Sequence, residues 1–194
     1  MNAHILVVCT ANVCRSPLAE QLLRARLADW APGALTVFSA GTHAAYNHSI
    51  CPEADRILGR ARLETSVHNP RQLTQELVTD AQLILTADRD HRAAVARLAP
   101  EARWCTFTLR EAAALAGVAF RAADPWGKPG PAVDHLADFV DHLNRTRGLA
   151  EPTFDIADGH GYGARRHRSA LQEVDSAVAD IAAGLSRYGT IAPD

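Results

Sequence analysis

Apolar and polar residues alternate along the chain in blocks whose lengths predict an alternation of strands and helices. Four segments have the length and composition of strands, at residues 4–9, 35–40, 82–87 and 103–108, and the first of them is a continuous apolar run. Apolar residues at helical spacing separate or follow them, at residues 17–30, 52–58, 89–98 and 109–116. Strands joined by helices imply right-handed crossovers, so we expect an α/β fold with a four-stranded parallel sheet flanked by helices.

Two longer amphipathic segments follow the fourth strand. One covers about residues 132–146 and the other lies near the end of the chain, where apolar side chains from Leu171 to Leu185 share one face. The stretch between them, residues 148–163, has the composition of a loop. Because no repeat or linker interrupts the pattern, residues 1–194 are expected to form a single domain.

Composition narrows the classes of function. The net charge of −2 and the lack of a clustered basic face argue against a nucleic-acid partner. The N-terminus has neither the basic segment nor the long apolar segment of a signal peptide, and no apolar run approaches the ~20 residues that span a bilayer. Four scattered cysteines suit a reducing compartment, and no cysteine–histidine spacing predicts a metal. We therefore expect a cytoplasmic chain without membrane partner, cofactor or metal, as a monomer or weak dimer.

The segment after the first strand carries the candidate chemistry. It runs Cys9-Thr10-Ala11-Asn12-Val13-Cys14-Arg15-Ser16-Pro17, with Ser16 as a candidate helix cap and Pro17 in the first turn. A loop between a strand and a helix N-terminus presents backbone N–H groups and the positive end of the helix dipole to an anion. Arg15 can hold two phosphate oxygens, and both the helix and the arginine favour the thiolate form of Cys9. A phosphate site with a cysteine nucleophile is the interpretation.

This loop resembles the signature V-C-x-G-N-x-C-R-S-P of the low-molecular-weight protein tyrosine phosphatases, with Ala11 at a position where that family often has Gly. If that position needed positive φ, Ala11 would strain and stiffen the loop. The resemblance implies the fold of that family, hydrolysis of phosphate monoesters through a phosphocysteine, and phosphate binding by residues 10–16. It also implies that no metal or cofactor takes part.

Two further segments resemble the same family. Ser39-Ala40-Gly41-Thr42 is similar to its S-A-G-T segment, and the segment from His68 to Leu73 is similar to its H-x-x-R-Q-[LI] segment. The resemblance implies that Ser39 and His68 hydrogen-bond the phosphate loop and, with Asn12, fix the directions of its amides.

Two aspartates are candidates for the general acid that protonates the leaving oxygen. Asp124 opens the Asp-Pro pair of the sequence, and Asp158 lies in a segment similar to the family's D-[IV]-x-D-P-[YH]. We favour Asp158, which implies an insertion at about residues 117–153 carrying an extra helix before the C-terminal one, as in longer actinobacterial-type relatives. Gly159 stands where the family has Pro, and we expect it to loosen this loop.

Substrate class is less closely determined. Tyr46, His160 and Tyr162 are the candidate walls of the cleft, and Val13 stands where related arginine phosphatases carry Thr. These features favour a protein phosphotyrosine, with a small phosphorylated metabolite such as a sugar or nucleotide as the alternative. An arginine phosphatase, an arsenate reductase and a non-catalytic anion-binding module are weaker readings, and residues 78–98 lack the cysteines that an arsenate reductase needs.

The remaining cysteines leave alternatives open. In the resembled family a cysteine placed like Cys14 can form a reversible disulfide with the nucleophile, here Cys9, and a small apolar filler under the helix is the other reading. Cys51 and Cys105 are expected to be structural.

Overall fold

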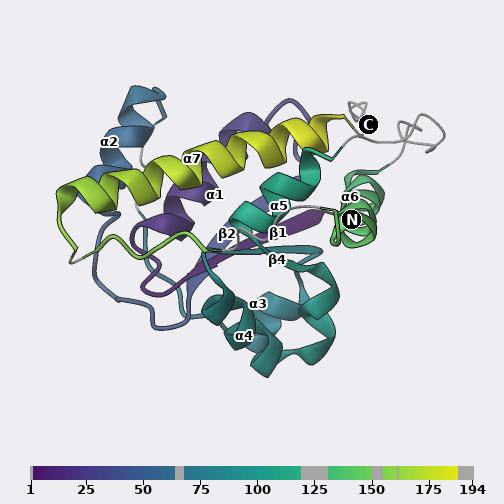
Figure 1. Ribbon diagram of the computed structural model, residues 1–194, viewed down its shortest axis with the longest axis horizontal. Coiled ribbons are helices and arrows are strands. Elements are labelled where there is room, and N and C mark those ends of the chain that lie inside the picture. Colours follow the sequence, from purple (N-terminus) through teal and green to yellow (C-terminus); the bar gives the residue numbers. More distant parts are fainter. Residues whose placement is uncertain (1, 64–67, 119–130, 150–154, 161, 188–194) are drawn as a thin grey trace.

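A computed structural model of the chain describes residues 2–63, 68–118, 131–149, 155–160 and 162–187 (Figure 1). Its centre is a four-stranded sheet in the order β2-β1-β3-β4, with every neighbouring pair parallel. The strands are β1 (Ala3–Cys9), β2 (Leu35–Gly41), β3 (Leu83–Thr86) and β4 (Thr106–Thr108). The predicted four-stranded parallel sheet is confirmed, and the register pairs Cys9 with Gly41 at its carboxyl edge.

Helices cover both faces of the sheet (Figure 1). One layer packs against Ile5 and Val7 of β1 and contains α1 (Arg15–Arg26), α2 (Pro52–Arg60), α5 (Leu109–Ala116), α6 (Ala132–Thr146) and α7 (Ala164–Ser186). The other packs against Leu6 and Val8 and contains α3 (Gln75–Thr79), α4 (Arg89–Leu98) and the 3-10 helix η1 (Pro100–Cys105). Alternate residues of β1 thus face opposite cores, as the period of two along a strand requires.

Two local expectations were wrong. Ser16 does not cap the first helix: α1 begins at Arg15, Cys14 is at the N-cap, and Ser16 is buried within the first turn. The fourth strand is shorter than predicted, because η1 occupies residues 100–105 and the Thr106 hydroxyl donates back to the Ala102 carbonyl at 2.6 Å. Pro100 begins that turn in the position where a fixed φ favours a helix.

The expected extra helix is present as α6, directly before α7 among the described helices. Its Phe139 and Leu136 are fully buried in the same core as α5 and α7. Arg147, just after α6, donates to Glu111 and to the Thr106 carbonyl and lies 4.3 Å above the Phe107 ring. Whether residues 117–153 are an insertion relative to shorter relatives stays a prediction. None of the described helices is long and apolar enough to cross a bilayer.

Candidate active site

The segment with the candidate nucleophile joins the carboxyl end of β1 to the start of α1. Cys9 ends the strand and is 2% exposed, and Arg15 begins the helix and is 4% exposed. Gly41 of the neighbouring strand lies against the turn, since a Cβ atom there would come within 2.5 Å of the Thr10 carbonyl oxygen. The predicted strand–loop–helix arrangement is therefore present, and it packs too tightly against β2 for a side chain at position 41.

The carbonyl groups of this loop are all directed outward. The oxygens of Cys9, Thr10, Ala11 and Val13 accept from backbone N–H groups between residues 42 and 51, and that of Cys14 accepts from Leu18. The Asn12 carbonyl lies 2.6 Å from His68 Nε2. In contrast, no contact within the described residues uses the N–H groups of residues 10–14 as donors. A loop with fixed carbonyls and unused amides is suited to an oxyanion, because successive backbone N–H groups in a turn form an anion-binding concavity.

Asn12 is the residue that gives the loop its shape. Its φ is +55°, and its side chain donates to Ser39 Oγ at 2.7 Å and to Ser16 Oγ at 2.9 Å. Its Oδ1 accepts from the Arg71 backbone N–H at 2.8 Å. The strain expected at Ala11 is absent, because the left-handed residue is Asn12, a type that tolerates this conformation. Sequence reasoning placed Ser39 and His68 beside this asparagine, where they lie, but missed Glu20, which accepts from Ser39 at 2.5 Å.

Ser16 and Cys9 form the contact nearest the expected chemistry. Their Oγ and Sγ atoms are 2.9 Å apart and both residues are buried. Since Ser16 Oγ already accepts from Asn12, its own proton is available to Cys9. A hydroxyl that donates to sulfur stabilises a thiolate over a thiol.

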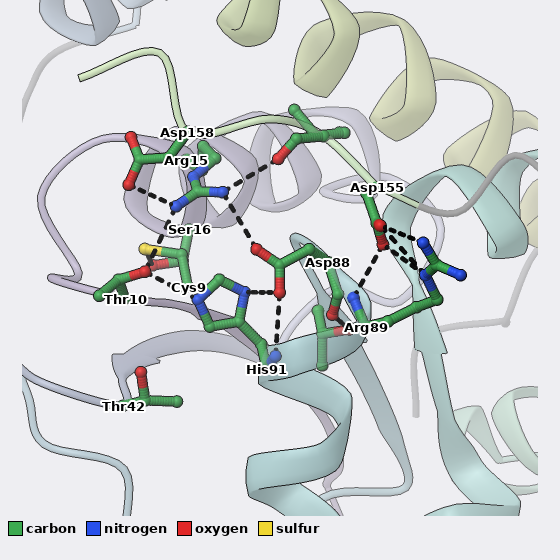
Figure 2. A network of polar contacts seen from close by, with 12 residues as sticks. Cys9, Thr10, Arg15, Ser16, Thr42, Asp88, Arg89, His91, Asp155 and Asp158 are labelled. Carbon is green, nitrogen blue, oxygen red and sulfur yellow. Dashed lines mark hydrogen bonds and ion pairs between the residues drawn. The ribbon is translucent and has the colours of Figure 1, made fainter. Parts of the chain in front are cut away.

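Arg15 joins the loop to the segment before α7. Figure 2 shows its guanidinium between two carboxylates, with Nη2 2.9 Å from Asp158 and Nη1 3.4 Å from Asp88. Nη1 also donates to the Ile156 carbonyl at 2.9 Å. Of the two candidate acids, Asp158 thus lies at the site, and its Oδ1 accepts from the His160 backbone N–H at 2.9 Å. Asp124 lies outside the described residues.

The acid-loop segment, residues 155–160, is held from both ends. The Ile156 N–H donates to the Ala87 carbonyl at 2.9 Å, and Asp155 pairs with Arg89 at the start of α4 at 2.8 Å. At the other end Gly159 is buried against α7, where a Cβ atom would come within 2.4 Å of the His167 Cα. The glycine permits a close approach between two backbones, and the expectation that it loosens this segment stays a prediction.

A pocket of about 210 Å³ opens above Cys9. Cys9 and the loop that follows it line one part of the pocket, and other segments contribute Ala45, His48, Asp158 and His160. His160 lines the pocket together with Ala45 and His48, which the sequence reasoning missed, and its role as a substrate wall stays a prediction. Tyr46 and Tyr162 are not among the lining residues and are 60% and 68% exposed, so a role for them with longer substrates stays a prediction.

Comparison with known proteins decides the family. Residues 4–151 match the family model described as low molecular weight phosphotyrosine protein phosphatase. This chain belongs to that family. The match covers the phosphate loop and both supporting segments, and it identifies the chain as a cysteine-dependent phosphatase.

Named relatives and solved structures agree. The low molecular weight protein-tyrosine-phosphatase Etp of Escherichia coli K12 is 33% identical over 141 residues, which are 73% of this chain and 89% of Etp. The tyrosine phosphatase Wzb from E. coli K30, solved with sulphate, has a TM-score of 0.65 at 25% identity over 96% of this chain and all of Wzb. The arginine phosphatase YwlE of Geobacillus stearothermophilus has a TM-score of 0.64 at 26% identity, covering 93% of this chain and 91% of YwlE.

The phosphatase carries a carboxylate–histidine pair that sequence reasoning missed. Asp88 caps α4 by accepting from the His91 N–H at 2.9 Å, and its Oδ1 lies 2.7 Å from His91 Nδ1 (Figure 2). The other ring nitrogen of His91 lies 2.9 Å from Thr10 Oγ1 in the phosphate loop. Burial raises the pKa of Asp88, but hydrogen bonds from His91 and the charge of Arg15 outweigh it and hold that pKa below its ordinary value. The signal was the Asp-x-x-His spacing after β3.

The four cysteines of the phosphatase are free thiols. Cys14 and Cys51 share a hydrogen bond, which raises the pKa of Cys14 and lowers that of Cys51 to about 6. The lowering at Cys51 is helped by His167, whose Nε2 lies 3.6 Å from its sulfur. That Cys51 is a structural residue stays a prediction. A Cys9–Cys14 disulfide stays a prediction.

Proposed function

We propose that this phosphatase hydrolyses phosphotyrosine in proteins, with Cys9 as nucleophile, Arg15 as phosphate ligand and Asp158 as general acid. The observation that carries the proposal is the convergence of these three side chains on one pocket with unused loop amides at its base. Relatives named protein-tyrosine phosphatases support the substrate class. No metal enters the proposed reaction.

The first step transfers the phosphoryl group to sulfur. The Cys9 thiolate forms the S–P bond while the bond from phosphorus to the leaving oxygen breaks, and Asp158 gives its proton to that oxygen. The N–H groups of residues 10–14 and the guanidinium of Arg15 hold the three equatorial oxygens. A bound phosphate takes over the Arg15 Nη2 that Asp158 holds at 2.9 Å, which leaves the carboxyl group above the leaving oxygen.

The second step returns the enzyme to its starting state. Asp158, now ionised, takes a proton from water, whose oxygen forms a bond to phosphorus as the S–P bond breaks. The departing sulfur becomes a thiolate again, and the Ser16 hydroxyl at 2.9 Å stabilises it. Arg15 keeps its place through the Ile156 carbonyl, so the phosphate ligand does not depend on Asp158 alone.

One observation keeps a second substrate class in consideration. The described lining of the pocket has Ala45 and His48 where a tyrosine-directed cleft was expected to have aromatic walls. A pocket with small and polar sides also fits a phosphorylated metabolite, since stacking on an aromatic ring is then not needed. Phosphoarginine, the substrate class in the name of YwlE, is the third candidate.

Three variants and a substrate panel test the proposal. Cys9→Ser should abolish turnover while phosphate binding persists, and Asp158→Asn should slow a poor alkyl-like leaving group by about 10²–10⁴-fold and p-nitrophenyl phosphate much less. Asp124→Asn is the matched control and should leave both rates unchanged. Near wild-type turnover by Cys9→Ser would end the proposal. A higher kcat/KM for a sugar phosphate or phosphoarginine peptide than for phosphotyrosine peptides would move it to that substrate.

A further inference from the structure

Two thiols and one imidazole meet beside the phosphate loop. The sulfurs of Cys14 and Cys51 and a ring nitrogen of His167 all lie within 4.8 Å of one another. Each residue lies at the start of a different helix: Cys14 and Cys51 are the N-caps of α1 and α2, and His167 is in the first turn of α7. The cluster is built by the fold, because these three segments are far apart in the sequence.

The separation between Cys51 and His167 matches that of two ligands of a tetrahedral ion, and Cys14 lies within 4.8 Å of both. Zinc with bonds of about 2.3 Å to sulfur and 2.0–2.1 Å to nitrogen places sulfur about 3.6 Å from nitrogen and sulfur about 3.8 Å from sulfur. Cys51 Sγ and His167 Nε2 are already 3.6 Å apart. The donor set of two thiolates and an imidazole is one that zinc prefers over magnesium or calcium.

The backbone around these ligands is held in place. The Cys51 N–H donates to the Val13 carbonyl at 2.9 Å, which ties the start of α2 to the residue before Cys14. The His167 N–H donates to the Gly163 carbonyl at 3.1 Å, and its Cα packs on Gly159. Cys51 is buried, whereas Cys14 and His167 are partly exposed, so an ion can reach the cluster from solvent.

We propose that Cys14, Cys51 and His167 form a binding site for Zn²⁺ next to the active site. The fourth position faces His160, whose Nδ1 lies 3.8 Å from Cys14 Sγ and whose ring packs on that of His167 at 5.4 Å between centroids. His160 or a water molecule completes the shell. Sequence spacing showed no metal motif because the ligands come together only in the folded chain.

An ion at this site acts on the phosphatase through the acid loop. His160 is two residues from Asp158, and its backbone N–H donates to that carboxylate at 2.9 Å. Cys14 belongs to the phosphate loop and lines the pocket. With His160 as the fourth ligand, zinc ties the acid loop to the phosphate loop and slows the movement of Asp158 between Arg15 and the leaving group. This consequence rests on the proposed role of Asp158, whereas the binding itself does not.

Binding is tested on the full chain with Cys9→Ser as the parent, since that substitution removes the nucleophile as a competing thiolate ligand. Reduced protein is titrated with Co²⁺, followed by its sulfur-to-metal charge-transfer and tetrahedral d–d absorption, and then with Zn²⁺ as competitor. We expect one equivalent of Co²⁺ with a two-thiolate charge-transfer intensity. Adding Cys51→Ser should halve that intensity and weaken binding by more than about 100-fold, since losing even an outer partner of a ligand costs 10–100-fold.

The variants separate this site from general thiol chemistry. Ser is a favoured N-cap, so Cys51→Ser should fold, and the partly exposed His167→Gln offers a second variant with the same expected loss of affinity. Cys105→Ser is the matched control and should bind like the parent, because its sulfur contacts the Ala81 and Ala102 carbonyls instead. Unchanged Co²⁺ affinity in both Cys51→Ser and His167→Gln, or its loss in Cys105→Ser, would overturn the proposal.

The effect on turnover is measured in the enzyme with Cys9 intact. Micromolar Zn²⁺ should lower kcat, and Cys51→Ser should remove that component of inhibition while Cys105→Ser keeps it. Equal inhibition of the wild type and Cys51→Ser would refute the link to the acid loop. The Co²⁺ titration tests whether the metal site exists, independently of any effect on the acid loop. Turnover measured without metal tests the proposed phosphatase function separately.

Discussion

Gly159 and His167 lie with their backbones in direct contact, so that a Cβ atom on Gly159 would come within 2.4 Å of the His167 Cα and 2.8 Å of its nitrogen. This contact sets the path of residues 155–160 over the pocket. The neighbours are backbone atoms of α7, which cannot move as the end of a flexible side chain can. The glycine therefore serves packing between the acid loop and the last helix.

The first prediction concerns this contact. Gly159→Ala should displace Asp158 and lower kcat on poor leaving groups by about 10²-fold, the order of loss that a misplacement of about 1 Å causes. Phosphate affinity should change much less, because the loop of residues 10–16 does not take part in the contact between Gly159 and His167. The matched control is Gly59→Ala, where nothing lies within 4 Å and the helix should gain about 0.5–1 kcal/mol. A normal kcat for Gly159→Ala would show that the acid loop adapts.

The second prediction separates the two roles of Asn12, its left-handed backbone and its three side-chain hydrogen bonds. Asn12→Gly keeps the left-handed backbone but loses the side-chain hydrogen bonds. We expect the free energy of unfolding to fall by about 1 kcal/mol for each bond lost. Asn12→Ala should cost about 1–2 kcal/mol more, because alanine resists positive φ. Both variants are compared with the wild type by urea unfolding and by their affinity for phosphate.

The exposed Asn47 provides the control for this pair, since its φ of +63° demands the same conformation. The difference in the free energy of unfolding between Asn47→Gly and Asn47→Ala should equal the difference between Asn12→Gly and Asn12→Ala. Both Asn47 variants should bind phosphate normally. Equal stability of Asn12→Gly and wild type would contradict the role of the hydrogen bonds.

The third prediction tests how α6 is joined to the sheet. Arg147→Ala removes one of two arginines from the buried Glu111 carboxylate, whose other partner is Arg92 at 2.9 Å. We expect a loss of about 1–3 kcal/mol in the free energy of unfolding, because a buried acceptor loses a charged donor. Arg110→Ala breaks a half-exposed pair with Glu173 and should cost about 0–1 kcal/mol. Equal losses in the two variants would show that burial of Glu111 adds nothing.

The fold and the phosphate loop could be predicted because their signals are local. Short segments rich in apolar residues mark the strands, and the residues from Cys9 to Ser16 are consecutive, so one segment of sequence carries the proposed nucleophile and the proposed phosphate ligand together. The error at Ala11 arose within this segment, since sequence does not say which of two neighbouring residues takes positive φ. The register of that turn depends on Ser39, Arg71 and Glu20 in other segments.

What could not be predicted depends on contacts between distant segments. Ala45 and His48 reach the pocket because the segment after β2 donates its amides to the carbonyls of the phosphate loop. Cys51 meets His167 because α2 and α7 both pack on α1. The length of β4 was overestimated for a local reason, since the 3-10 turn that begins at Pro100 ends in Trp104 and Cys105, and tryptophan is a residue type common in strands.

The last prediction concerns the anchor of the acid loop at α4. Hydrogen bonds from Arg89 hold the pKa of Asp155 below its ordinary value, against a smaller opposing effect of burial. A carboxylate whose pKa is lower in the folded chain stabilises the fold at pH values above its pKa in the unfolded chain, which is about 3.9. That stabilisation is lost as the pH falls through the pKa of the folded chain. The anchor is therefore complete at every pH at which the phosphatase is assayed.

It follows that Asp155→Asn should lower kcat on poor leaving groups by the same factor at every value between about pH 5 and 8. The exposed Asp90, next to Arg89 in the first turn of α4, gives the control, since Asp90→Asn leaves the pair with Asp155 intact. The measurement is kcat against pH for wild type and both variants. A deficit in Asp155→Asn that changes across this range would mean that the carboxylate titrates there and takes part in proton transfer. A constant deficit assigns Asp155 to positioning, because the ion pair with Arg89 fixes where Asp158 begins its approach to the leaving oxygen.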